Sequence, residues 1–182
     1  TARRGCVAPR SDASYISCIV DFLYWSSRNL RELVCEELVS AVDSLSSNVP
    51  ADQADKREKD LRAQGGKLIR DYIDSDFDEN KPPIHFDNLT PELFMSYVNR
   101  KRATRGTNVG KVCSAKTYDG FRTGLNHLFR LYRKVASEKF EKDLAMYYKG
   151  LKRQLATMMR KGKVCVFSFF ILFYFIPRTA SH

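Results

Sequence analysis

The sequence predicts an all-α protein, and three observations favour that fold class. Apolar residues recur at intervals of three and four along several segments. Two of these segments open with a residue type that caps helices, and no segment shows a comparably strong strand pattern of period two. With 182 residues, of which 43% are hydrophobic, the chain can bury one core of ordinary size. We therefore expect a small helical bundle preceded by further N-terminal helices.

The first predicted helix covers about residues 14–45. Its apolar residues keep helical spacing from Ile16 to Leu45, and neither Gly nor Pro interrupts them. Pro50 is expected to end this element, because proline lacks the N–H group that a continuing helix would use.

A second predicted helix, rich in charged residues, covers about residues 51–62. Its mixed charges are typical of a solvated helix face, and we expect the pair Gly65 and Gly66 to stop the helix. The following segment, 67–83, begins as a short helix and becomes an acidic linker that ends at two prolines.

Three more helices are predicted in the second half of the chain. Thr90 caps the first of them, with Pro91 at its first position. A glycine-containing basic loop, RKRATRGTNVGK, separates it from the next helix, which Ser114 caps, and the last helix covers about residues 139–161. The apolar faces of these helices predict a core that includes Leu93, Phe94, Tyr97, Phe121, Leu125, Leu128, Phe129, Leu144, Tyr148 and Leu151.

The sequence divides into three predicted parts. Residues 1–80 form an N-terminal helical region with the acidic linker, residues 81–163 form a basic helical domain, and residues 164–182 form a tail. From residue 164 to 176 the tail is apolar except for Ser168. A helix of this length spans about 20 Å, short of the roughly 30 Å hydrocarbon core of a bilayer. We therefore interpret the tail as a buried or non-native segment, and a membrane anchor as the alternative.

Charge is distributed unevenly along the chain. Lys and Arg outnumber Asp and Glu by 31 to 21. Residues 1–80 carry 11 basic and 15 acidic residues, whereas residues 81–182 carry 20 and 6. A segment with such an excess of positive charge repels itself unless an anionic partner lies against it. Nucleic acid is therefore the expected partner class, and an anionic membrane surface is the alternative.

The candidate DNA-binding residues lie on three successive basic elements. On the helix that follows Ser114, Arg122, Asn126 and Arg130 are four residues apart and share one face. Arg and Asn side chains suit both phosphates and base edges of a duplex. The full predicted set comprises Arg100, Lys101, Arg102, Arg105 and Lys111 of the loop region, Lys116, Thr117, Arg122, Asn126, Arg130 and Arg133 of the helix, and Lys152 and Arg153 of the last helix.

Signatures of enzymes, metal sites and cofactor sites are scarce. The sequence contains no GxGxxG, GxxxxGK[ST], GxSxG or HExxH motif. The five cysteines form no CxxC pair and no group with the three histidines, so we expect no metal site, no cofactor and free thiols in a reducing compartment. His127 and Arg130 form an H-x-x-R pair, but no further catalytic residues accompany them, and we expect no catalytic role.

The segments LTPELFMSYVNRKRATRG, KVCSAKTYDGFRTGLNHLFRLY and FEKDLAMYYKGLKRQLA carry a family resemblance. Together, over about residues 86–161, they resemble the N-terminal core-binding domain of tyrosine recombinases and phage-type integrases, most closely the eukaryotic Crypton-like mobile-element type. The upstream segment FLYWSSRNLRELVCEELVSAV resembles a helix that such proteins carry before this domain. The resemblance implies a SAM-like helical bundle that forms half of a clamp around DNA.

In that family a separate C-terminal domain supplies the catalytic Arg, Lys, His-x-x-Arg and nucleophilic Tyr. Here the sequence continues after KGK into the apolar tail, so we expect DNA binding related to integration and recombination but no strand cleavage by this chain. The expected partner is double-stranded DNA and the expected compartment is the nucleus. The alternatives are a membrane-associated protein, and a recombinase whose catalytic domain is missing from this sequence.

Overall fold

The computed structural model confirms the all-α fold. It describes residues 9–46, 54–74, 78, 80–101 and 112–161, and within them it contains α-helices, two short 3-10 turns and no strand. The α-helices are α1 (Pro9–Asn29), α2 (Glu36–Ser46), α3 (Ala54–Asp74), α4 (Pro91–Arg100), α5 (Ala115–Leu131) and α6 (Glu138–Arg160). The 3-10 turns are η2 (Arg31–Leu33) and η3 (Phe86–Asn88).

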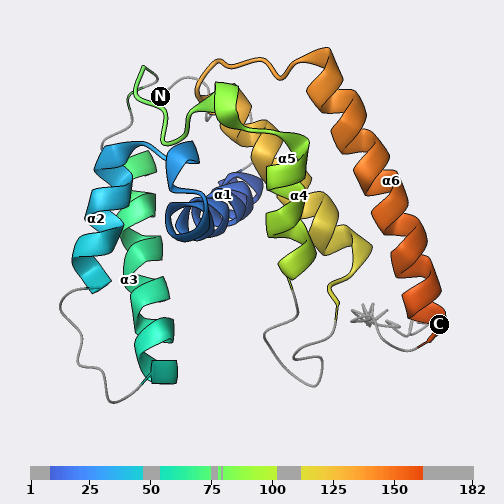
Figure 1. Ribbon diagram of the computed structural model, residues 1–182, viewed down its shortest axis with the longest axis horizontal. Helices are drawn as coiled ribbons and strands as arrows, with labels where there is room; N and C mark the ends of the chain where they lie inside the picture. The colour runs from blue at the N-terminus through green and yellow to red at the C-terminus, as the bar shows by residue number, and fades with distance from the viewer. Residues whose placement is uncertain (1–8, 47–53, 75–77, 79, 102–111, 162–182) are drawn as a thin grey trace, which may run out of the picture.

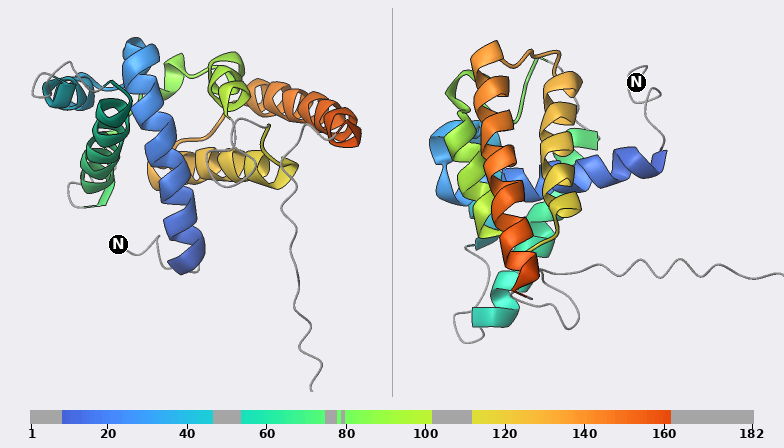
Figure 2. Two further views of the ribbon diagram at one scale, coloured as in Figure 1. Left: turned by 90° about the horizontal axis from the view of Figure 1, so that it is seen from below. Right: turned by 90° about the vertical axis from the view of Figure 1, so that its right-hand side faces the viewer.

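Helix α1 lies at the centre of the molecule. Figures 1 and 2 show α2 and α3 on one side of it and α4, α5 and α6 on the other. Its residues 22–27 are all buried, which requires neighbours around the whole circumference of the helix. Sequence periodicity alone indicates an apolar stripe along this segment, whereas the structure encloses it on every side.

The predicted continuous helix over residues 14–45 is wrong in its middle. The chain leaves α1 after Asn29, makes the turn η2, and then extends at Val34, which pairs with Ile84 in an isolated antiparallel bridge. The backbone N–H of His85 donates to the carbonyl of Leu33 (2.8 Å), so the break leaves these backbone groups hydrogen bonded. Val34 is buried in the bridge, just as an apolar residue on the inner face of a helix would be. The helical spacing of apolar residues in the sequence therefore continues across the break.

The prediction that Gly65 and Gly66 stop the second helix is also wrong, since α3 runs through both. A Cβ atom on Gly65 would lie 2.5 Å from the ring of Tyr24 on α1. Gly124 has the same role on α5, because its Cβ would lie 2.8 Å from the Cβ of Cys18. These glycines therefore allow α3 and α5 to approach α1 more closely than any other residue would.

A single cluster of buried side chains extends from α1 to α6. It crosses residue 80, where the sequence predicts a domain boundary, and that boundary stays a prediction. Most of the predicted core is buried, whereas Leu93, Phe121 and Leu151 are half-buried. No helix in the described part of the chain is long and apolar enough to cross a membrane, and the apolar tail lies outside that part.

Replacing Gly124 by Ala is expected to destabilise the protein, because the added methyl group would press against Cys18 at the α1–α5 contact. Overpacking typically costs about 1–3 kcal/mol, against a gain in helix propensity of about 1 kcal/mol. Gly120 is the matched control on the same helix: a Cβ there meets nothing within 4 Å, so Gly120→Ala should stabilise. Urea unfolding followed by circular dichroism measures both variants. Equal stabilisation by the two substitutions would contradict the close contact.

Candidate nucleic-acid interface

The most regular basic feature of the structure is a row on α5. Ser114 caps this helix, and its side-chain oxygen accepts a hydrogen bond from the backbone N–H of Thr117 (3.3 Å). Leu125, Leu128 and Phe129 point into the core, whereas Asn126 and Arg130 are exposed on α5. Arg133 is also exposed, in the turn that follows the helix, and with Asn126 and Arg130 it forms the exposed row.

Arg122, which the sequence places in the same row, is engaged between two helices. It is half-buried, and its guanidinium lies over the ring of Tyr148 on α6, 5.6 Å from the centroid. The hydroxyl of Tyr148 donates to the carbonyl of Tyr118 (3.0 Å), and burial raises the pKa of this phenol, so it stays neutral. Arg122 therefore holds α6 against α5 by a cation–π contact.

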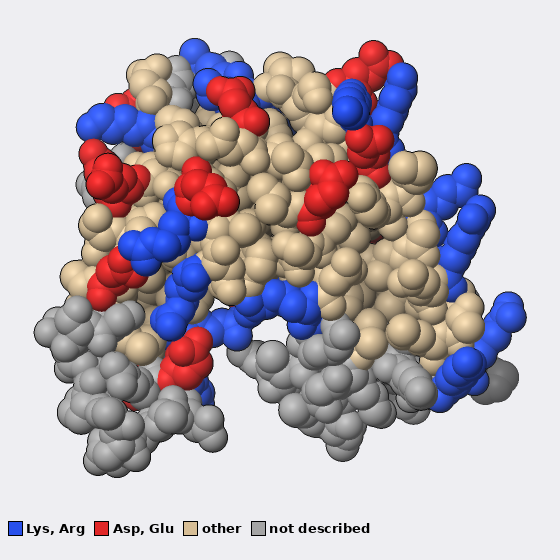
Figure 3. Space-filling view, viewed as in Figure 1, with Lys and Arg blue, Asp and Glu red and all other residues tan. Residues whose placement is uncertain are grey.

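The C-terminal half of α6 adds further positive charge beside α5. After Asp143 this helix contains no acidic residue, and Lys149, Lys152, Arg153 and Arg160 are exposed. Lys152 pairs with Asp119 of α5 (3.1 Å), and both side chains are about half exposed, so the pair contributes little stability. Figure 3 shows Lys and Arg side chains along the outer edge of α6, with acidic ones near its N-terminal end. Arg130 and Arg133 lie near the turn between the helices, where Phe129 meets Phe140, whereas Lys152 lies beside the first half of α5. We define the α5–α6 basic surface as both groups together: Asn126, Arg130 and Arg133 with Lys149, Lys152, Arg153 and Arg160.

Lys101, a predicted DNA contact, forms an ion pair inside the protein. Its ammonium group pairs with the carboxylate of Asp21, which also accepts a hydrogen bond from the hydroxyl of Tyr97 (2.6 Å) and pairs with Arg62. Only 12% of the Lys101 side chain is exposed. Burial and the neighbouring arginines lower the pKa of Lys101 despite Asp21. This lysine therefore compensates a buried carboxylate rather than facing a partner.

The other predicted contacts are distributed over several places. Arg100 lies over the ring of Trp25, 5.3 Å from its centroid, on the side of α1.

Lys116 is exposed in the first turn of α5, whereas Thr117 is half-buried and its N–H is used by the Ser114 cap. The helix N-terminus thus offers fewer backbone donors to a phosphate than the sequence suggests. Three of the predicted loop residues lie outside the described part of the chain: Arg102, Arg105 and Lys111.

The H-x-x-R pair faces α1. The imidazole of His127 is buried, with its Nε2 3.0 Å from the carboxylate of Asp12 and its Nδ1 3.4 Å from the guanidinium of Arg130. The ring of Tyr15 lies 5.4 Å away. His127 therefore connects α5 to α1 and positions Arg130 at the edge of the exposed row. The described residues contain no group of three or more His, Cys, Asp or Glu side chains that could hold a metal ion.

Sequence reasoning missed the role of Asp21. Its partners come from α3 and from α4 with its C-terminal cap, far along the sequence from Asp21, so no local pattern identifies them. Burial acts to raise the pKa of the carboxyl, but Lys101, Tyr97 and Arg62 together hold it below its ordinary value of 3.8. The signal in the sequence is a single acid at a position where helical spacing predicts burial.

Asp21→Asn should lower the free energy of unfolding at pH 7 by about 1.5–3 kcal/mol, the usual size of a hydrogen-bonded charged contact. Because the pKa of Asp21 is lowered on folding, its stabilisation is complete above pH 3.8 and is lost as the pH falls through the lowered pKa. The difference between the two proteins should therefore shrink in acid. Unfolding in urea at several pH values measures it.

The matched control is Asp43→Asn, which removes a carboxylate from the exposed pair with Arg31. Since both side chains of that pair are about half exposed, we expect a loss below about 1 kcal/mol. Equal losses for the two variants would mean that the Asp21 cluster behaves as an ordinary surface ion pair.

No protein-family model, curated protein or solved structure matches this chain.

Proposed function

We propose that this chain binds double-stranded DNA through the α5–α6 basic surface. The observation that carries the proposal is the exposed row Asn126, Arg130 and Arg133, which lies in a segment without Asp or Glu from residue 120 to 137. Among the described residues, Arg130 forms no ion pair with a carboxylate. Its charge is therefore available to a partner.

The two helices of this surface are held side by side. Figure 2 (right) shows α5 and α6 next to each other, and the Arg122–Tyr148 and Lys152–Asp119 contacts join them. The rings of Phe129 and Phe140 meet near the turn between the helices, with centroids 5.8 Å apart. A rigid pair of helices keeps cationic side chains at fixed spacing, which favours simultaneous contacts to several phosphates.

Phosphate contacts would supply most of the affinity, which makes binding strongly dependent on salt. Arg130 and Asn126 are one helical turn apart, about 6 Å, so they can reach neighbouring positions on a duplex. Arg suits guanine or phosphate and Asn suits adenine, so any base readout would come from this row. The surplus of acid in residues 1–80 disfavours binding of a DNA duplex across that part of the chain.

The resemblance to recombinase core-binding domains supports the same proposal, because that module holds DNA in the family. The chain then contributes DNA binding, in the nucleus, to a process of the recombination or integration type and performs no cleavage step. A phosphotyrosine adduct trapped on a nicked suicide substrate would contradict the absence of cleavage.

Removing two charges from the row tests the proposal. Arg130→Gln with Arg133→Gln should weaken duplex binding and make the slope of log K against log salt shallower by about two units, near one per lost phosphate contact. Fluorescence anisotropy of a labelled duplex across a salt series measures the slope. Circular dichroism should show unchanged helicity, since both side chains are exposed.

The matched control removes two exposed charges from α3, Lys59→Gln with Lys67→Gln. It lowers the net charge equally but should leave the slope unchanged. If both double variants reduce affinity alike, the protein attracts DNA by net charge alone and the α5–α6 basic surface is not the site. If the arginine variant binds as the unmodified protein does, the row is only a solvated helix face.

A further inference from the structure

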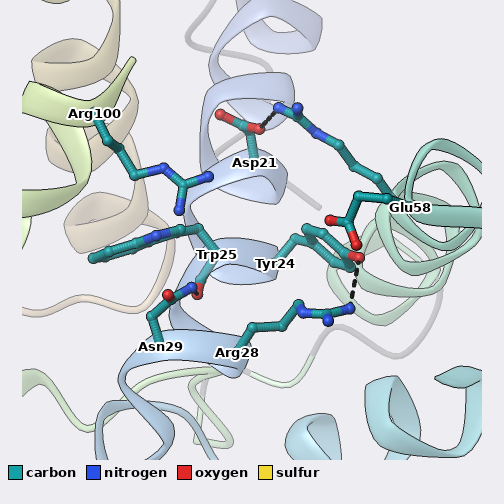
Figure 4. A pocket seen from close by; sticks show the side chains of 8 residues that line it. Asp21, Tyr24, Trp25, Arg28, Asn29, Glu58 and Arg100 are labelled. Carbon is teal, nitrogen blue, oxygen red and sulfur yellow. Dashed lines mark hydrogen bonds and ion pairs between the residues drawn. The ribbon is translucent and has the colours of Figure 1, made fainter. Parts of the chain in front are cut away.

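A polar pocket lies between α1, α3 and α4, away from the residues of the α5–α6 basic surface. Its volume is about 360 Å³, within the range of roughly 300–1,000 Å³ typical of small-molecule sites. Figure 4 shows side chains from these helices around it. The lining comprises Asp21, Tyr24, Trp25, Arg28, Asn29, Glu58, Arg62 and Arg100.

Two of its guanidinium groups are oriented by aromatic rings rather than by carboxylates. Arg100 lies along the indole of Trp25, and Arg28 donates a hydrogen bond to the hydroxyl of Tyr24 (3.3 Å) while lying 6.0 Å from that ring's centroid (Figure 4). Among the described residues, neither arginine pairs with an acid. Both retain N–H groups for a ligand in a geometry that stacking restricts.

The two carboxylates of the lining do not cancel this charge. Asp21 is already compensated by Arg62 and by Lys101 behind it. Glu58 is then the remaining carboxylate of a lining that also contains Arg28 and Arg100. The pocket therefore keeps an excess of positive charge at its open face, which favours an anionic ligand.

The remaining polar groups can accept hydrogen bonds. The amide nitrogen of Asn29 donates to the carbonyl of Trp25 (2.8 Å), which leaves the side-chain oxygen of Asn29 as an acceptor. Glu58 adds a carboxylate, also an acceptor. Two forked cations and two acceptors match a phosphate joined to a base with amino or N–H groups.

We propose that this pocket binds a single nucleotide, with its phosphate held by Arg28 and Arg100. The nucleotide is either free or the 5′-phosphorylated end of a single strand, since both present the same chemistry. The site is separate from the proposed duplex-binding surface and does not depend on it.

Trp25 is the only tryptophan of the chain, so its fluorescence reports on this pocket directly. Titration of the full chain with adenosine 5′-monophosphate should change the emission in a saturable way. Inorganic phosphate should compete for the site, and adenosine without a phosphate should bind at least about tenfold more weakly. Equal binding of adenosine, or no saturable change with the nucleotide, would overturn the proposal.

Variants are compared by calorimetry, because substitution of Arg100 changes the surroundings of Trp25 itself. Arg28→Gln with Arg100→Gln should lose at least about tenfold in nucleotide affinity, as expected when charge-assisted hydrogen bonds are removed. Arg28→Lys with Arg100→Lys should lose only part of the nucleotide affinity, because lysine keeps the positive charge but lacks the planar, forked guanidinium group. Unchanged affinity in the Gln variant, with its thermal midpoint preserved, would refute the assignment.

The Arg130→Gln, Arg133→Gln protein is the matched control, with the same loss of charge outside the pocket. It should bind the nucleotide within about twofold of the unmodified protein, while the pocket variant keeps the salt slope of duplex binding. Failure of one site is thus distinguishable from failure of the other.

Tighter binding of a 5′-phosphorylated than of a 5′-hydroxyl single strand supports a strand end as the source, and equal binding supports a free nucleotide.

Discussion

The close packing of α3 and α5 on α1 sets the geometry of the whole molecule. At Gly65 and Gly124 these helices approach so near that a Cβ atom would overlap Tyr24 or Cys18. Each missing side chain shortens the distance between two helix axes, and the neighbouring apolar residues then meet in one continuous core. Burial, with Asp21 nearby, raises the pKa of the Cys18 thiol to about 11 and keeps it neutral at the crossing with α5.

Enclosing α1 on all sides has an electrostatic consequence at Asp21. Removing its carboxylate from water is costly unless cations and donors replace the lost hydration. Lys101 and Tyr97 supply them from the α4 side and Arg62 from α3. The same three-helix junction brings Arg28 and Arg100 to one pocket. The compensation of one acid and the proposed nucleotide site are therefore products of a single packing arrangement.

Local signals in the sequence predicted the second half of the chain well. Thr90 and Ser114 cap α4 and α5 as expected, because a cap depends only on residues within one turn. The errors arose where a distant segment decides the structure. The break after α1 depends on pairing with Ile84, and the helix through Gly65 depends on contact with Tyr24. Likewise the pocket draws on three helices, so no spacing within one of them could reveal it.

Whether a basic side chain is available to a partner depends on whether a carboxylate of the protein lies next to it. A count of charges in the sequence does not show this. Arg62 and Lys101 share Asp21, and Arg31 faces Asp43, so each of these cations already lies against a carboxylate of the protein. On α5, Arg130 contacts the ring nitrogen of His127, and among the described residues it pairs with no carboxylate. The positive charge of the second half is therefore concentrated on helices that contain few acids of their own. Repulsion among these cations falls when a polyanion lies against them, and this electrostatic gain favours DNA over a neutral partner for the α5–α6 basic surface.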